Sequence, residues 1–342
     1  MDFGNPQRPL EPELAEFEAL AEAAGARVLE RIVQRRDAVD PATLVGSGKA
    51  REIAERAKDL GATLLLVLDD LRPRQRKNLE KIVPLPIVDR TMLILDVFAR
   101  HARSREGKLQ VELAQLRYRQ SNLIGVGADL SRLGGGIGTR GPGESKLEVD
   151  RRRIQQRVSV LRRALAEVRK QRAVRRAAAH RDPLASLVGY TNVGKSSLLN
   201  ALARSDALVA DRPFATLDPT VRRAYLGPNA YARVADTVGF ITDLPKDLVA
   251  AFRATLEELQ DADVLVHVLD ASNPDWPRQR AAVEALLAEL ELDRKPRLVA
   301  FNKCDAAAEL PREPGALFVS ARTGSGLSDL RSAIAAVTGQ NR

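Results

Sequence analysis

The residues from Gly189 to Ser196 read GYTNVGKS and have the types and spacing that bind phosphate. They fit the pattern G-x-x-x-x-G-K-[ST], in which glycines let backbone N–H groups point inward at phosphate oxygens. Lys195 would place a positive charge near the β- and γ-phosphates, and the Ser196 hydroxyl can bind Mg²⁺. The alternative is a chance match in a glycine-rich loop, and the later motifs argue against it. The predicted phosphate contacts are Gly189, Tyr190, Thr191, Asn192, Val193, Gly194, Lys195 and Ser196.

A second group of residues would sense the γ-phosphate. In the segment RPFATLDPT a threonine can bind Mg²⁺ as switch loops do, and Thr216 is the prediction, with Thr220 as the alternative. Asp236 can hold the water shell of Mg²⁺, and the N–H of Gly239 can bond the γ-phosphate. The predicted contacts of this group are Phe214, Ala215, Thr216, Leu217, Asp218, Asp236, Thr237, Val238 and Gly239, with Ser196 and Thr216 as the Mg²⁺ ligands.

No catalytic residue can be assigned from the sequence. Phe240 occupies the place where many switch GTPases carry a glutamine that orients the attacking water, and phenylalanine has no group for that task. Thr242 and Asp243 are the candidates to replace it. We therefore expect the free protein to hydrolyse nucleotide slowly and an external group to complete the site.

The third group would select the base. In the stretch PRLVAFNKCD, the carboxylate of Asp305 can accept hydrogen bonds from the ring N–H and the amino group of guanine together, which adenine does not offer. The N–H of Ala321 would meet guanine O6. The predicted contacts are Asn302, Lys303, Cys304, Asp305, Ser320, Ala321 and Arg322. Together the three groups predict a GTP hydrolase whose cofactor is Mg²⁺.

These motifs each follow a predicted strand, so the elements that position them form an open α/β sheet. We expect an α/β fold: a mostly parallel P-loop GTPase domain at residues 182–342, with helices on both faces of its sheet. It would follow an N-terminal α/β domain at residues 1–100 and a basic helical hairpin at residues 101–181. In the first domain we predict helices over residues 13–24, 50–60 and 74–82. We predict strands over residues 27–36, in the run TLLLVLDD that begins at Thr63, and in the run LPIVD just before Arg90. His267, within the apolar run VLVHVLD, is predicted to be a core residue.

The middle region combines an apolar rhythm with positive charge. Helices are predicted over residues 91–105 and 107–122, and apolar residues recur three or four apart from Leu147 to Val168, which indicates a further helix. We therefore expect an antiparallel helical hairpin with a loop of about 20 residues. Residues 100–181 hold 21 Lys and Arg against 7 Asp and Glu, although the whole chain has a net charge of +9. The glycine-rich loop GGGIGTRGPGESK has interleaved cations, which suits contact with folded RNA. The predicted RNA contacts are Arg132, Arg140, Lys146, Arg151, Arg152, Arg153 and Arg157; the alternative is a solvated helix surface.

Composition indicates the compartment. One cysteine excludes an intramolecular disulfide, and no apolar run approaches the roughly 20 residues that a membrane span needs. The N-terminus lacks the basic start and apolar core of a signal peptide. We predict a cytoplasmic protein, with no feature that demands a dimer and a monomer as the expectation.

The chain resembles the HflX family of ribosome-associated GTPases in the order of three stretches. These are DRTMLILDVFARHARSREGKLQVELAQLRY, then GGGIGTRGPGESKLE, then the GTPase motifs with FATLD and DTVGF. The resemblance covers about residues 27–338. It implies binding of GTP and GDP, contact of the glycine-rich loop and helices with RNA of the large ribosomal subunit, and splitting of stalled ribosomes. Some members bind ATP through the N-terminal domain, and no residues here can be assigned to that. The alternatives are an RNA-binding or ribosome-assembly switch without splitting activity, and a signalling GTPase with protein partners only.

Overall fold

The computed structural model describes most of the chain. The described residues are 2–3, 10–36, 38–133, 142–179, 182–203, 220–241 and 257–339. The chain divides into two compact units, residues 1–100 with 109–166 and residues 101–108 with 167–342. Among the described residues, no helix has both the length and the apolar composition to cross a membrane.

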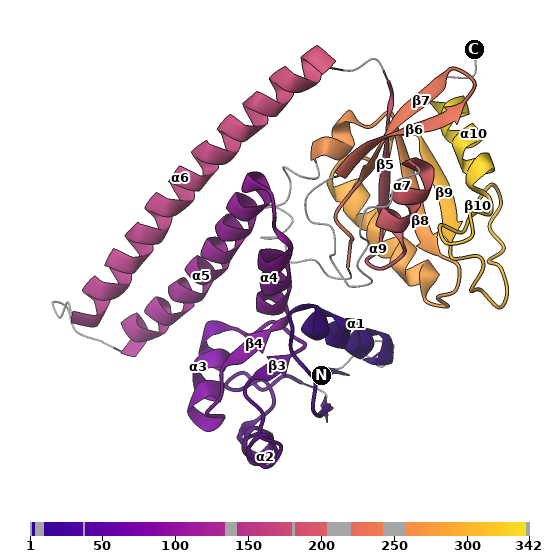
Figure 1. The fold of residues 1–342 in the computed structure, drawn as a ribbon. Helices are drawn as coiled ribbons and strands as arrows, with labels where there is room; N and C mark the ends of the chain where they lie inside the picture. Colours follow the sequence, from indigo (N-terminus) through magenta and orange to yellow (C-terminus); the bar gives the residue numbers. More distant parts are fainter. Residues whose placement is uncertain are drawn as a thin grey trace. The chain divides into compact units, whose positions relative to one another are not determined.

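The first unit begins with a small α/β core, as predicted (Figure 1). Its elements are β1 (Asp2–Phe3), α1 (Leu10–Ala23), β2 (Arg35–Arg36), α2 (Ser47–Asp59), β3 (Leu65–Val67), α3 (Pro73–Ile82), β4 (Ile87–Asp89) and α4 (Arg90–His101). Both strand pairs, β1 with β2 and β3 with β4, are parallel. The strand predicted over 27–36 is wrong except at its end. Residues 27–34 form no ladder in the described part of the chain, and a strand needs a paired neighbour to satisfy its backbone.

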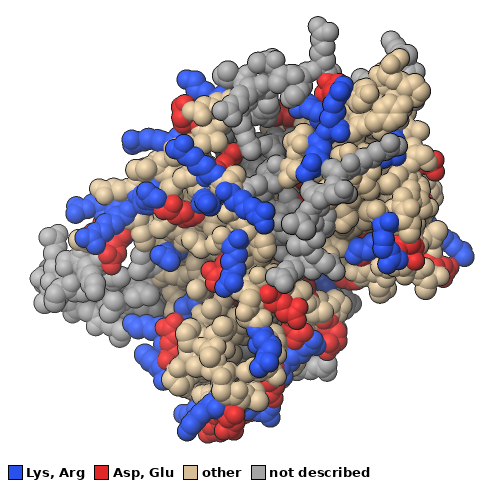
Figure 2. Space-filling model, viewed as in Figure 1, with Lys and Arg blue, Asp and Glu red and all other residues tan. Residues whose placement is uncertain are grey.

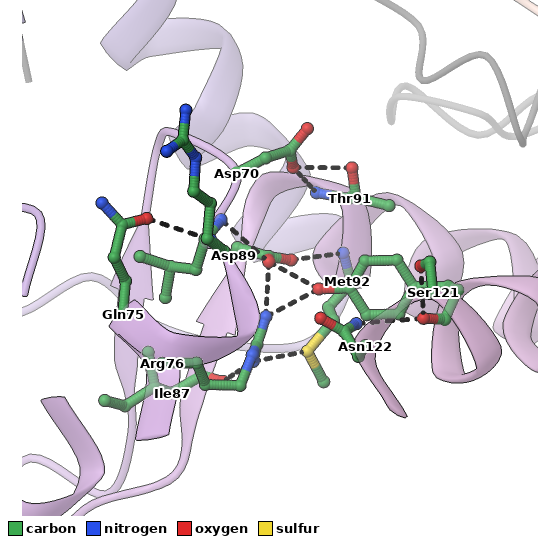
Figure 3. Close-up of polar contacts among 12 residues, drawn as sticks. Asp70, Gln75, Arg76, Ile87, Asp89, Thr91, Met92, Ser121 and Asn122 are labelled. Carbon is green, nitrogen blue, oxygen red and sulfur yellow. Dashed lines mark hydrogen bonds and ion pairs between the residues drawn. The ribbon is translucent and has the colours of Figure 1, made fainter. Parts of the chain in front are cut away.

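A buried polar network joins this core to the next helix (Figure 3). The Asp89 carboxylate accepts from the Tyr118 hydroxyl at 2.5 Å and from the backbone N–H of Met92 at 2.9 Å. It also pairs with Arg76, which donates to the Tyr118 hydroxyl at 2.6 Å. Burial, followed by the hydrogen bond to Asp89, raises the pKa of Tyr118, so its hydroxyl stays a donor. Because Asp89 is fully buried, these bonds offset the cost of removing its charge from water.

The long helices α5 (Arg105–Leu133) and α6 (Pro142–Ala179) lie side by side (Figure 1). Leu113 of α5 packs with Val158, Leu161 and Leu165 of α6, which confirms the predicted apolar seam. Both helices extend further than predicted, so the segment between them is shorter than the expected loop. Pro142 suits the first turn of α6 because its missing N–H would have no helical partner there. Residues 134–141 lie outside the described part of the chain.

The second unit is built on a six-stranded sheet in the order β10-β9-β8-β5-β7-β6 (Figure 1). Its elements are β5 (Leu184–Gly189), α7 (Lys195–Ala203), β6 (Thr220–Gly227), β7 (Ala230–Asp236), η1 (Glu257–Asp261), β8 (Val264–Asp270), α9 (Trp276–Glu289), β9 (Arg297–Asn302), β10 (Leu317–Phe318) and α10 (Leu327–Val337). Only the β6–β7 pair is antiparallel. The parallel strands therefore bring their carboxyl ends to one edge, where the described residues of the predicted motifs lie.

Buried strands and the helices packed against them form the core of this unit. Every residue of β5 and β8 is buried. His267 lies among them as predicted, and burial lowers its pKa to about 3, so it packs as a neutral ring. Trp276 of α9 packs edge-on against Phe301 of β9, with ring centroids 5.0 Å apart. On the other face, Arg331 of α10 donates to the carbonyl of Ala201 at 3.1 Å, at the carboxyl end of α7.

Candidate functional site

The phosphate-binding loop leaves β5 at Gly189 and enters α7 at Lys195. Asn192 and Gly194 have positive φ values of 61° and 87°, so the loop curls between strand and helix. A Cβ at Gly194 would lie 2.4 Å from Nδ2 of Asn302, so only glycine lets the two segments approach this closely. A curled loop that opens a helix is the backbone arrangement that forms anion sites, because its N–H groups can point at phosphate oxygens.

The Lys195 side chain lies folded against this loop. Its ammonium donates to the carbonyl of Gly189 at 3.1 Å and to that of Tyr190 at 2.8 Å. Burial lowers the pKa of Lys195 to about 8, although the nearby Asp236 acts in the opposite direction. An ammonium has three donors, so two bonds hold the group in place and the third can meet a phosphate.

A hydroxyl and a carboxylate meet beside Lys195. The Ser196 hydroxyl donates to Oδ2 of Asp236 at 2.5 Å, and Asp236 is buried at the end of β7. Oxygen donors of this kind are the ligands that Mg²⁺ prefers, so the two side chains fit that ion. The other predicted ligand, Thr216, lies outside the described part of the chain, as do Phe214, Ala215, Leu217 and Asp218.

The segment after β7 passes directly against the phosphate loop. Thr237 donates from its hydroxyl to the carbonyl of Leu187 at 2.7 Å. A Cβ at Gly239 would lie 2.8 Å from Cγ2 of Thr191 and 3.2 Å from Nζ of Lys195, so glycine is required there too. Val238, the remaining predicted contact, is buried. The backbone of Gly239 is thus beside the lysine that would hold the terminal phosphates.

Phe240 locks this segment in place instead of facing a substrate. Its N–H donates to the carbonyl of Gly189 at 3.1 Å, and its carbonyl accepts from the N–H of Thr191 at 2.7 Å. The side chain is only 2% exposed and belongs to the core. The structure therefore gives this ring a packing role, and Thr242 and Asp243 lie outside the described residues.

The base-selecting motif is tied to the phosphate loop by side chains. Asn302 donates from Nδ2 to the carbonyl of Val193 at 2.9 Å, and Lys303 donates to the carbonyl of Asn192 at 2.7 Å. Cys304, at the variable position, is partly buried and donates its N–H to Val319. The phosphate loop and the base-selecting loop therefore form one hydrogen-bonded edge, which the spacing of motifs along the chain could not show.

Two predicted guanine contacts, Ala321 and Asp305, bond within the base-selecting loop and its neighbours. The N–H of Ala321, predicted to meet guanine O6, donates to Oδ1 of Asn302 at 3.0 Å because the two loops close on each other. The Asp305 carboxylate accepts from the Ser320 hydroxyl at 2.6 Å and pairs with Arg322. The hydrogen bond from Ser320 is the largest cause that lowers the pKa of Asp305, and it keeps the group an acceptor.

The predicted RNA-contacting residues fall into different environments. Arg151, Arg152 and Arg153 are exposed on α6. Arg157 instead forms a two-bond ion pair with Glu112 of α5, at 2.6 and 2.9 Å. This pair joins the two helices, and the Arg157 side chain remains exposed. The side chains of Arg132 and Lys146, and the whole of Arg140, lie outside the described part of the chain.

The helical geometry identifies which cations face away from the seam. With 3.6 residues per turn, Arg152 and Arg163 project opposite the apolar residues Val158, Leu161 and Leu165. Both arginines are exposed, and they lie about 16 Å apart along α6 at 1.5 Å per residue. Figure 2 shows Lys and Arg side chains projecting from the molecular surface among fewer acidic ones. We call Arg152 and Arg163 the outer ridge of α6.

Sequence reasoning missed Asp270, at the end of β8, which pairs with Lys303 at 2.7 Å. The available signal was its position, because Asp270 ends the buried run VLVHVLD just as Asp236 ends the preceding strand.

Three family models match the chain in order. A GTP-binding GTPase N-terminal model matches residues 11–99, a GTP-binding GTPase middle-region model matches residues 101–179, and a 50S ribosome-binding GTPase model matches residues 185–303.

Curated relatives match over nearly the whole chain. A protein named GTPase HflX from Caldanaerobacter subterraneus subsp. tengcongensis is 46% identical over 327 residues, which cover 95% of this chain and 76% of the relative. GTPase HflX from Escherichia coli K12 is 44% identical over 332 residues, covering 94% and 78%.

Solved structures share the fold. The crystal structure of SsGBP with GDP has a TM-score of 0.52 and 23% identity, covering 97% of this chain and 96% of that one. A GTP-binding protein from Sulfolobus solfataricus, also with GDP, has a TM-score of 0.50 and 24% identity, covering 98% and 97%. At these identities the likeness concerns the fold alone.

Proposed function

Because this chain belongs to the HflX family of GTPases, we propose that it binds the large ribosomal subunit in its GTP state and separates stalled ribosomes. The observation that carries the proposal is the hydrogen-bonded edge of the GTPase sheet. There the phosphate loop is tied to the base-selecting loop through Asn302 and Lys303, and to the segment after β7 through Phe240. A change at the terminal phosphate can therefore be transmitted to the rest of the unit.

In the proposed mechanism, backbone N–H groups from Gly189 to Ser196 hold the phosphates, and Lys195 uses its third donor on them. Ser196 and Thr216 would hold Mg²⁺, and Asp236, which accepts from the Ser196 hydroxyl, would orient water bound to it. The ion would supply positive charge that offsets the charge developing on the phosphates. The N–H of Gly239 contacts the γ-phosphate. Asp305 reads the guanine edge while Asn302 and Lys303 keep the base-selecting loop against the phosphate loop.

The step that this chain does not complete by itself is placement of the attacking water. Phe240 is buried and has no polar group, so we propose that docking on the large subunit supplies the missing positioning or charge. External groups of this kind raise turnover by about 10³–10⁵-fold in other GTPases. Hydrolysis would then be slow in the free protein and faster on its target.

The helical hairpin is the proposed RNA-binding element. The outer ridge of α6 presents guanidinium groups away from the apolar seam, where they can pair with phosphates of ribosomal RNA. Each lost phosphate contact should reduce the slope of log affinity against log salt by about 0.7–0.9. A solvated helix face would show no such change.

The test is sedimentation of large subunits with the full chain over a range of salt, in a non-hydrolysable GTP analogue and in GDP. We expect binding in the analogue, and weaker, less salt-dependent binding after Arg152→Gln with Arg163→Gln. The matched control is Arg278→Gln with Arg312→Gln, which removes the same charge from the GTPase unit, where Arg278 lies 3.7 Å from Asp275 and Arg312 lies 3.9 Å from Glu309. Equal salt slopes in both double variants would contradict the RNA assignment.

Splitting is tested with intact ribosomes on a sucrose gradient. The analogue-bound protein should convert them to subunits and remain on the large one, since release requires hydrolysis. Binding to the large subunit without any loss of intact ribosomes would leave an assembly or inspection role and would contradict splitting.

A further inference from the structure

Asp270 is a buried carboxylate at the carboxyl edge of the GTPase sheet. It ends β8 and lies directly beside Asn302 in the register of β8 with β9. Its side chain is 11% exposed, so its charge must be stabilised by specific partners. None of the contacts proposed above for phosphate, Mg²⁺ or guanine involves Asp270.

The partners of Asp270 fix both of its oxygens. Oδ1 accepts from the backbone N–H of Ser272 at 2.9 Å and from the Ser272 hydroxyl at 2.6 Å. Oδ2 accepts from the ammonium of Lys303 at 2.7 Å. The carboxylate is therefore held by its own turn and in turn sets the position of the Lys303 ammonium.

Lys303 extends this chain of contacts to the phosphate loop. The same ammonium donates to the carbonyl of Asn192 at 2.7 Å. Both Asn192 and Lys303 have φ of 61°, a region that is unfavourable for a residue other than glycine. Two unfavourable backbone conformations, one in each loop, are thus joined by one ammonium that Asp270 holds.

We infer that Asp270 is a positioning residue for nucleotide binding: it holds Lys303 so that the phosphate loop and the base-selecting loop keep their bound geometry before nucleotide arrives. The inference rests on the proposed nucleotide site. The contacts of Lys303 that Asp270 holds reach Asn192 and the base-selecting loop but not the γ-phosphate side of the site. Asp270 therefore supports the binding of GTP and the binding of GDP equally.

The test is titration of the full chain with a fluorescent GDP and with a fluorescent non-hydrolysable GTP analogue, both with Mg²⁺. In Asp270→Asn the amide oxygen can still accept from Ser272, but the charge facing Lys303 is lost. We expect about tenfold weaker binding of both nucleotides, through faster dissociation. Asp270→Glu keeps the charge and should stay within threefold of the wild type; an equal loss in both variants would overturn the role of the charge.

A second background shows whether Asp270 acts through Lys303. Lys303→Met removes the ammonium, so adding Asp270→Asn to it should change the affinity by less than twofold. A full tenfold loss in that background would overturn the inference. Glu313→Gln is the matched control, since it removes a carboxylate paired with Arg280 at 2.7 Å in the same unit, and its nucleotide affinities should equal those of the wild type.

Failure of the site assignment is distinguishable from failure of the tie. Asp305→Asn should weaken GTP and GDP binding if the nucleotide site is correctly assigned. If Asp305→Asn has no effect, the assignment of the nucleotide site is wrong. If Asp305→Asn weakens binding and Asp270→Asn does not, the positioning role of Asp270 is wrong. Thermal unfolding of each variant without nucleotide verifies folding, and a lowered melting temperature with unchanged affinities would show that Asp270 only stabilises the fold.

Discussion

Replacing Phe240 by glutamine is expected to destabilise the GTPase unit without accelerating GTP hydrolysis. Glutamine is the residue that orients water in many switch GTPases, so the substitution would supply the missing group if the side chain faced the nucleotide. The structure buries the ring instead, and the backbone of Phe240 is bonded on both sides to the phosphate loop. A glutamine there would place an amide in an apolar space.

The magnitude follows from the burial of Phe240. Removing a buried phenylalanine ring costs about 3–5 kcal/mol in protein cores, and a poorly bonded buried amide adds to that cost. For a unit of 150–250 residues each kcal/mol lowers the melting temperature by about 2–4 °C, so a loss of at least about 6 °C is expected. Phe240→Leu keeps an apolar side chain and should cost only about 1–1.5 kcal/mol.

The single tryptophan makes the assay specific to the GTPase unit. Trp276 packs against Phe301 in that unit, so its fluorescence reports unfolding there and not in the N-terminal unit. Melting is followed at saturating GDP. Phosphate release is measured at saturating GTP, with and without large ribosomal subunits, for the wild type, Phe240→Gln and Phe240→Leu.

Two results would refute the reasoning. A Phe240→Gln protein that melts with the wild type and hydrolyses GTP more than tenfold faster when free would show that the side chain reaches the attacking water. Equal wild-type rates with and without subunits, with binding confirmed, would show that the subunit supplies nothing to the reaction.

Three further predictions concern other parts of the chain. Asp305→Asn should shift the preference from GTP toward xanthosine triphosphate, because the amide offers a donor where the carboxylate accepted; competition titrations that still favour GTP to the same degree would contradict guanine reading by this residue. Burial lowers the pKa of Lys195 to about 8, so above pH 8 the Lys195 side chain of the free protein has lost its proton. Binding of phosphate requires that proton to be taken up again, so GDP affinity should fall as pH rises, by at most about tenfold per pH unit. Affinities that stay constant between pH 7 and 9 would argue against that proton uptake. Tyr118→Phe removes the hydroxyl between Arg76 and Asp89 and should lower the free energy of unfolding of the N-terminal unit by about 1.5–3 kcal/mol, seen as faster hydrogen exchange in α5, with unchanged GDP affinity as the control.

Local patterns in the sequence were sufficient for the fold class and for the prediction of a GTPase. The phosphate-loop spacing, the strand-end Asp236 and the motif around Asn302 are each defined by residues within a few positions of one another, so they can be read along the chain. The apolar rhythm of α5 and α6 likewise identified the seam, because helical periodicity maps directly onto one face. The strand expected over 27–36 failed since a strand requires a partner that local composition does not specify.

Tertiary structure decided which of these groups touch one another. Arg157 pairs with Glu112 across 45 residues of sequence, Lys303 with Asp270 across 33, and Asn302 with the carbonyl of Val193 across 109. The tertiary structure also placed the Phe240 ring in the core. Contacts between residues so far apart arise from strand order and helix packing, which bring the carboxyl ends of the parallel strands to one edge of the sheet. The sequence by itself therefore determined which ligand chemistry this protein has, while the sheet determined which residues hold that chemistry in place.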